Sequence, residues 1–253
     1  MIYAIDMDGV IVDSRIQVLI DVYNAYREIF KHTQLFNNKR IDLENYEEIL
    51  EKNRRVLANF KKLTVYAKSA GENIFAFYLI DKKINVKNDS EFRAELSQIS
   101  EDDILKWHTE FYKQRYIFQN QEGWQKIIKP FPDMIRFIKR SISNTIILSN
   151  KDLRTIRMIL KYFNVDIKSE NIFSQEITLD KNKKLELIKN KLKIDYKDII
   201  FIDDNFMNIR DAKLLGTRCF MASWGVNNVM QIKQAKKLGI DILRLKDLAN
   251  FSC

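Results

Sequence analysis

The chain is poor in the residue types that build disulfide frameworks and metal sites of the Cys/His kind. Its 253 residues include only two cysteines, two histidines, two prolines and six glycines. Cys219 and Cys253 have no metal-ligand spacing, and one of them ends the chain, so a reducing cytosol fits best. His32 and His108 each lie in a helix-like stretch without a second ligand nearby, which favours ordinary surface or core positions.

Long hydrophobic runs are also missing. No stretch approaches the length of a membrane span, and the acids at positions 6 and 8 interrupt any apolar signal-peptide core. We therefore expect a cytoplasmic protein without a membrane partner.

What the chain does have is apolar residues (46%), charged residues (30%) and a net charge of +9. This composition is typical of a folded globular protein, and the length suffices for one sizeable core and a smaller one. The positive balance favours anionic partners. Because the lysines are scattered instead of forming one block, it indicates small phosphorylated substrates more than nucleic acid.

Residues 15–127 carry helical patterning throughout. Apolar residues recur every three or four positions, and only Gly71 and Gly123 interrupt a stretch without proline. We expect a helical domain of four or five helices, with loops near 31–39, Gly71 and 82–90. Its aromatic residues have helical spacing, which favours core packing over a base-stacking surface. Examples are Tyr66, Phe75, Phe77, Tyr78, Trp107, Phe111, Tyr112 and Tyr116.

From residue 128 onward the pattern alternates between strand and helix, which indicates parallel βαβ units. A break at 130–133 precedes a helix at 134–140, with Asp133 as its expected N-cap. Expected strands are 145–148, 172–173, 199–202, 218–221 and 241–243, and expected helices are 152–163, 181–192, 206–215 and 229–238. The apolar run 2–5 must join this sheet because four residues cannot fold alone. The prediction is an α/β core of residues 1–14 and 128–253, a Rossmann-like parallel sheet flanked by helices, with 15–127 inserted between its first two strands and covering the active site.

Two carboxylates follow the first strand directly, at Asp6 and Asp8, with Gly9 behind them. In an open α/β sheet, ligands bind at this end of the strand. Such a pair can supply a nucleophile and a general acid, or bind Mg²⁺ through hard oxygens. Helix capping by either aspartate is the simpler alternative.

Later strands end in residues that suit phosphate chemistry. Ser149 and Asn150 offer a hydroxyl and an amide for a phosphoryl oxygen, although Ser149 could also be an N-cap. Asp203 and Asp204 form a second acidic group at the same edge, which a divalent cation would balance, so a Mg²⁺ site shared with Asp6 and Asp8 is expected. Asn208, one turn later, can orient Asp204 or a metal-bound water.

A phosphoryl group also needs a positive charge near its free oxygens. Lys181, Lys183 and Lys184 open the helix before the second acidic group. Lys181 lies four residues before Leu185 on the buried face, whereas the other two point elsewhere. Lys181 is therefore the predicted phosphate ligand, and a solvated lysine run is the alternative for all three.

These groups, taken in order, resemble the haloacid dehalogenase superfamily of phosphohydrolases, in particular its phosphoglycolate-phosphatase-like members. The matching stretches are Asp6-x-Asp8-Gly9-Val10-x-Val12-Asp13-Ser14, Ile147-Leu148-Ser149-Asn150, Lys181 and Phe201-Ile202-Asp203-Asp204-x-x-x-Asn208-Ile209-x-x-Ala212, with a tail running from Gly216-Thr217 to Leu248. The inserted helical segment lies where this family has its helical cap.

The resemblance implies a Mg²⁺-dependent phosphatase with an aspartyl-phosphate intermediate. Asp6 would be the nucleophile and Asp8 the acid and base, while Ser149 and Lys181 would hold phosphoryl oxygens. Asp204 and the backbone carbonyl of Asp8 would complete the metal site.

The sequence departs from the family pattern at the last acidic group. Asp203 stands where glycine is more frequent, and Asn208 replaces an acid, so the roles of Asp203 and Asp204 stay open. Two other functions stay open as well: a sugar phosphomutase of the same superfamily, and a non-catalytic binding or regulatory module on the same fold.

Overall fold

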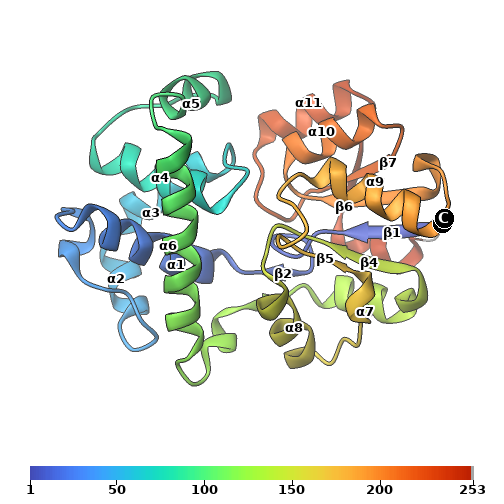
Figure 1. Cartoon of the computed structure of the whole chain (residues 1–253), viewed down its shortest axis with the longest axis horizontal. Coiled ribbons are helices and arrows are strands. Elements are labelled where there is room, and N and C mark those ends of the chain that lie inside the picture. Colours follow the sequence, from blue (N-terminus) through green and yellow to red (C-terminus); the bar gives the residue numbers. More distant parts are fainter. Residues whose placement is uncertain (252–253) are drawn as a thin grey trace. The chain divides into compact units, whose positions relative to one another are not determined.

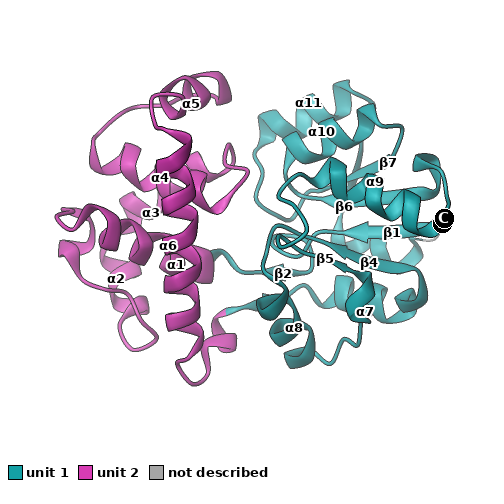
Figure 2. Ribbon diagram, in the orientation of Figure 1, with its two compact units in different colours: residues 1–15, 128–253 teal, residues 16–127 magenta. Residues whose placement is uncertain are grey.

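The computed structural model describes residues 1–251, so Cys253 lies outside the described part. Contacts within the chain divide it into two compact units. One unit, called the core unit below, contains residues 1–15 and the chain from residue 128 onward, and the other, the helical unit, contains residues 16–127 (Figure 2).

A six-stranded sheet forms the centre of the core unit. Its strands are β1 (Ile2–Ile5), β4 (Thr145–Leu148), β5 (Ile172–Phe173), β6 (Ile199–Asp203), β7 (Arg218–Ala222) and β8 (Asp241–Leu243). They lie in the order β5-β4-β1-β6-β7-β8, and every neighbouring pair is parallel. The prediction of a parallel α/β sheet is confirmed, and β1 lies between β4 and β6.

Helices cover both faces of this sheet. They are α7 (Pro132–Arg140), α8 (Leu153–Tyr162), α9 (Lys181–Leu192), α10 (Phe206–Leu214) and α11 (Val229–Lys237). Figure 1 shows α9, α10 and α11 on one side of the sheet and α7 and α8 on the other. On the first side, Leu185 and Ile188 of α9 and Ile209 of α10 are completely buried against Ala4 and Phe201. This apolar layer holds the start of α9 against the sheet.

The start of α7 differs from the prediction. Asp133 is not the N-cap: the helix begins at Pro132, and Phe131 precedes it without a side-chain capping bond. Proline suits the first helical position because its backbone angle is already helical and its missing N–H has no partner there anyway. Asp133 instead pairs with Arg136 one turn later.

A second, two-stranded sheet lies where the chain leaves and re-enters the core unit. In it β2 (Val12–Asp13) pairs antiparallel with β3 (Lys129–Pro130). Val12 is opposite Pro130, and Asp13 is opposite Lys129. The sequence patterns did not predict this pairing, since two-residue strands are too short to show alternation.

The helical unit contains six α-helices, which is more than the four or five predicted. They are α1 (Arg15–Phe30), α2 (Tyr46–Lys52), α3 (Arg54–Thr64), α4 (Ala70–Asp81), α5 (Asp89–Leu96) and α6 (Glu101–Gln119). Gly71 lies in the first turn of α4 and not in a loop. A Cβ at this position would lie 2.9 Å from the carbonyl oxygen of Ile104, so the glycine permits close packing of α4 on α6.

Aromatic side chains fill much of the interior of the helical unit, as the helical spacing indicated. Phe75, Phe77 and Trp107 are buried, and Phe77 stacks on Phe60 with ring centroids 4.4 Å apart. A charged pair is buried among them: Arg115 Nε of α6 lies 2.8 Å from Asp21 Oδ2 of α1.

No helix of the described residues is long and apolar enough to cross a membrane.

Candidate active site

The first carboxylate follows β1 directly. The amide of Asp6 donates to the carbonyl of Ile202 at 3.0 Å, which continues the pairing of β1 with β6 by one residue. The chain then turns sharply: the amides of Ile11 and Val12 donate to Met7 O at 3.0 and 3.1 Å. Gly9 sits inside this turn with φ +76°, a conformation that is easy only for glycine.

Three buried carboxylates meet at the carboxyl ends of β1 and β6. Asp6, Asp203 and Asp204 each present one oxygen, and these oxygens lie within 4.8 Å of one another. Burial raises the pKa of Asp6 to about 6; the Lys181 ammonium opposes this shift, and repulsion from Asp203 and Asp8 adds to it. Burial, with repulsion from Asp203 and Asp6, also raises the pKa of Asp204 well above its usual range. Such a cluster is expected to be more stable with a cation present.

One lysine lies against this cluster. The Lys181 ammonium is 2.6 Å from Asp203 Oδ2 and 3.0 Å from Asp6 Oδ1, and its side chain is almost completely buried. Burial disfavours the charged ammonium and lowers the pKa of Lys181. The attraction of the Asp203 and Asp6 carboxylates is larger than this effect, so the pKa of Lys181 is raised overall. The interpretation of a solvated lysine is therefore wrong for Lys181, and it is also wrong for Lys184, which is fully buried; Lys183 is exposed.

The two neighbouring aspartates of β6 differ in their partners. Asp203 accepts hydrogen bonds from Lys181, from Asn208 Nδ2 at 3.1 Å and from the amide of Asn205 at 2.8 Å. Asp204 accepts one from the amide of Val226 through Oδ2. Asn208 was expected to orient Asp204 or a water, whereas its side chain binds Asp203.

Two glycines leave room for the Asp204 carboxylate. A Cβ on Gly9 would lie 2.7 Å from Asp204 Cγ and would overlap a carboxylate oxygen. A Cβ on Gly225 would also overlap Asp204 and would lie 2.5 Å from the carbonyl oxygen of Gly9. The backbones of Gly9 and Gly225 therefore pack directly on Asp204, and neither tolerates a side chain in this arrangement.

Asp8 lies apart from the three-carboxylate cluster and has its own partners. Its Oδ1 accepts a hydrogen bond from the Ser14 hydroxyl and lies 3.0 Å from the Lys151 ammonium. The Lys151 side chain is fully buried, while that of Asp8 is 33% exposed. Lys151 is not among the residues predicted from the sequence, although its position directly after Ser149 and Asn150 could have indicated it.

Ser149 and Asn150 follow β4 at the same edge of the sheet. The β1–β4 register pairs Ile5 with Ile147, which puts Asp6 level with the last residue of β4. Ser149 is buried, and its hydroxyl accepts from the amide of Lys151 at 3.3 Å. The Asn150 side chain donates to the carbonyl of Leu179 at 2.9 Å and accepts from Lys184 Nζ at 2.7 Å. The structure thus engages Asn150 with protein groups on both sides of its amide.

The hard oxygen donors at this edge fit a divalent metal ion. Asp6, Asp203 and Asp204 are the described residues whose oxygens converge closely enough to hold one. Carboxylate oxygens are the ligands that Mg²⁺ takes in proteins. Burial is the main cause of the raised pKa values of Asp6 and Asp204, and repulsion between the neighbouring carboxylates adds to it; a bound cation would offset both.

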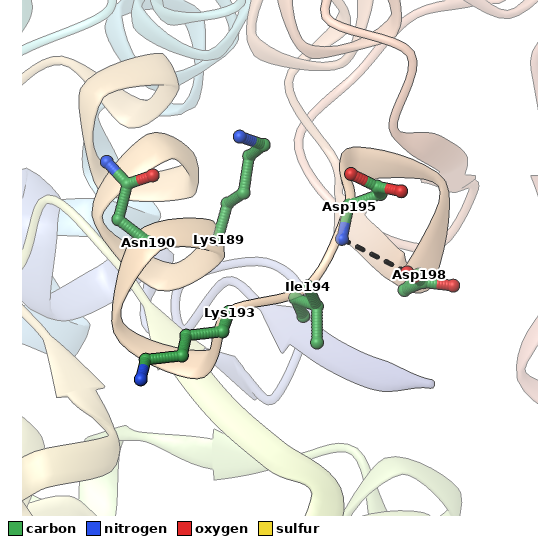
Figure 3. A pocket seen from close by; sticks show the side chains of 6 residues that line it. All are labelled: Lys189, Asn190, Lys193, Ile194, Asp195 and Asp198. Carbon is green, nitrogen blue, oxygen red and sulfur yellow. Dashed lines mark hydrogen bonds between the residues drawn. The ribbon is translucent and has the colours of Figure 1, made fainter.

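A surface hollow lies at the other end of α9 (Figure 3). Lys189, Asn190 and Lys193 line it from the end of the helix, and Ile194, Asp195 and Asp198 line it from the following segment. Lys193 is about 18 Å along the helix axis from Lys181. None of the residues predicted for catalysis lines this hollow, so it is separate from the acidic cluster.

Comparison with known proteins identifies the family. A family model for haloacid dehalogenase-like hydrolases matches residues 1–216. The chain belongs to this family. No curated protein sequence matches the chain. The resemblance seen in the opening acids and the later motifs is thus confirmed at the level of the haloacid dehalogenase-like hydrolases.

Solved structures of similar fold cover nearly the whole chain. A predicted phosphoglycolate phosphatase from Haemophilus somnus has TM-score 0.62 and 13% identity, covering 98% of this chain and 96% of that one. A hydrolase from Pseudomonas syringae has TM-score 0.62 and 12% identity, with 99% of each chain covered. A haloacid dehalogenase-like family protein from Streptococcus pneumoniae has TM-score 0.58 and 15% identity, covering 99% and 97%. At these identities the likeness concerns the fold.

Proposed function

We propose that the protein is a Mg²⁺-dependent phosphatase that hydrolyses small phosphate monoesters through a phosphorylated Asp6. The observation that carries the proposal is the convergence of Asp6, Asp203 and Asp204 with the ammonium of Lys181 at one edge of the sheet. Nucleophile, metal ligands and a phosphate-binding cation are thereby within reach of one another, as phosphoryl transfer requires. Membership of a hydrolase family supports the same reaction class.

In this proposal Asp6 attacks phosphorus and the bond to the leaving oxygen breaks. Asp8 donates a proton to that oxygen, so the alcohol leaves neutral. Asp8 then accepts a proton from a water that attacks the aspartyl phosphate, which releases inorganic phosphate and restores Asp6. Since Ser14 and Lys151 both contact Oδ1 of Asp8, Oδ2 is the oxygen we assign to proton transfer.

Mg²⁺ would be held by Asp6 and Asp204, with the Asp8 carbonyl as a further ligand. When bound, it would neutralise charge between the nucleophile and the phosphoryl oxygens. Asp203 already accepts three hydrogen bonds from protein groups, so we assign it to orienting Lys181 and not to the metal. Lys181 and Ser149 would bind the phosphoryl oxygens; Asn150 would support them. That the helical unit covers the active site stays a prediction.

The test is turnover of p-nitrophenyl phosphate with and without Mg²⁺. We expect activity that EDTA removes, that added Mg²⁺ restores, and that Asp6→Asn abolishes while the melting temperature stays within a few degrees of wild type. Phosphoglycolate is the first natural ester to assay, because a neighbour in fold carries that name. Turnover that survives Asp6→Asn would contradict the proposed nucleophile.

Release of free phosphate also separates this function from its alternatives. A phosphomutase would convert a sugar phosphate into an isomer without releasing phosphate. A binding module would show no turnover of any ester. Localisation in the cytoplasm and a preference for small substrates over nucleic acid remain part of the proposal.

A further inference from the structure

Lys184 is a buried lysine next to the proposed active site that the reaction outlined above does not use. It lies on α9, three residues after Lys181, and its side chain has no exposed surface. Its ammonium donates to the backbone carbonyl of Ser149 at 2.5 Å and to Asn150 Oδ1 at 2.7 Å. Within residues 1–251, no carboxylate lies within ion-pair distance of this ammonium.

The two acceptors belong to the turn that carries the predicted phosphate ligand. Ser149 begins this turn at the end of β4, and the amide of Asn150 also holds the carbonyl of Leu179, just before α9. Lys184 therefore joins the end of β4 to α9. Ser149 and Lys181 lie on these two elements, which the Lys184 side chain links directly.

Lys184 is costly to bury. Burial and the nearby positive charge of Lys181 lower the pKa of Lys184 to about 7. A methionine has similar length and would fill the space without this cost. Stability alone therefore does not explain a lysine here, whereas a role in the site does.

We propose that Lys184 is a positioning residue that fixes the spacing between the Ser149 hydroxyl and the Lys181 ammonium. The inference rests on the proposed function, because it assigns Ser149 and Lys181 to the phosphoryl oxygens. Without Lys184, the turn and the helix move independently, and both ligands no longer meet the same phosphate. Loss of the Lys184 ammonium therefore weakens phosphate binding and turnover but does not weaken folding.

The test compares Lys184→Met with Lys183→Met. Lys183 is the adjacent, exposed residue of the same helix, which makes it a matched control. Three quantities are measured: the dissociation constant of inorganic phosphate by calorimetry in Mg²⁺, kcat and KM for p-nitrophenyl phosphate, and the melting temperature. For Lys184→Met we expect phosphate binding and kcat/KM weaker by roughly 10- to 100-fold, as for a ligand misplaced by about 1 Å, with an equal or higher melting temperature. Lys183→Met should match wild type in all three.

Two results would overturn the inference. Wild-type phosphate affinity and kcat/KM in Lys184→Met would show that the spacing does not depend on this side chain. The second result concerns folding. If Lys184→Met loses phosphate affinity together with melting temperature, and Lys184→Gln, which keeps a hydrogen-bond donor, shows the same two losses, the role of Lys184 is purely structural. If the wild-type chain binds phosphate but turns over no ester, the proposed function fails while the affinity comparison still decides the role of Lys184.

Discussion

Replacing single glycines around Asp204 tests whether this carboxylate must lie where the structure has it. A Cβ at Gly9 would lie 2.7 Å from Asp204 Cγ, whereas ordinary van der Waals contact begins at 3.4 Å. In Gly9→Ala, Asp204 must therefore retreat by about 0.7 Å or more, and overpacking of this kind costs typically ~1–3 kcal/mol. The positive φ of Gly9 adds about 1–2 kcal/mol of backbone strain.

Two further glycines separate these effects. Gly225 meets the same carboxylate, but its φ lies outside the left-handed region, so Gly225→Ala has the steric clash without that strain. Gly216 has φ +89° and nothing within 4 Å of the Cβ position, so Gly216→Ala has the strain without the clash. The three variants form a matched set.

The assays are thermal unfolding and the Mg²⁺ concentration that gives half-maximal turnover. We expect Gly9→Ala and Gly225→Ala to lose on the order of 100-fold in kcat/KM and to need more Mg²⁺, because active-site geometry tolerates only about 0.5 Å of displacement. Gly216→Ala should lose stability but keep the Mg²⁺ requirement of wild type. An equal Mg²⁺ requirement in Gly225→Ala and Gly216→Ala would show that the position of Asp204 does not control metal binding.

Three other substitutions give separate tests. Lys151→Met should lower kcat by roughly 10-fold or more with little change in KM, since the Lys151 ammonium pairs with Asp8 while its contact with Ser149 is made by the backbone amide, which the substitution keeps. Steady-state kinetics checks this, and an unchanged kcat would contradict it. Burial lowers the pKa of Lys184 to about 7 from an ordinary 10.5. Between these two pH values the unfolded chain binds one proton more than the folded chain. The free energy of unfolding of the wild type therefore rises with pH relative to that of Lys184→Met. Urea unfolding should show the advantage of Lys184→Met shrinking by roughly 1–3 kcal/mol from pH 7 to pH 9, and a constant difference would contradict the shift. Arg115→Met should destabilise the helical unit by about 3–5 kcal/mol because it leaves Asp21 buried without its charged partner, which thermal unfolding measures; a melting temperature like that of wild type would count against this role.

The parallel sheet could be predicted from the sequence because its strands are short, mostly apolar runs, and a polar residue ends the run or follows it directly. Ligands bind at the carboxyl ends of such strands, which predicts that Asp6 and Asp203 lie at one edge of the sheet. The choice of Lys181 followed from helix geometry, since it lies on the face that also buries Leu185. These inferences needed only periodicity and topology.

The missed features depend on contacts between distant segments. Lys184 is fully buried because the turn after β4 reaches over α9 and supplies two acceptors, which no helical periodicity reveals. Lys151 is buried beside Asp8 for a similar reason. The glycine signal predicts a loop at Gly71, yet the residue lies in α4, and the reason for the glycine is the close approach of Ile104, which leaves no room for a Cβ.

The pairing of β2 with β3 has a consequence for how the chain is assembled. Val12 and Asp13 leave the core unit beside Lys129 and Pro130, which bring the chain back. The 112 residues of the helical unit are therefore joined to the core unit through two adjacent, paired strands. A short turn could bridge these two strands, so we expect the core unit to keep its strand order with inserts of other lengths at this point.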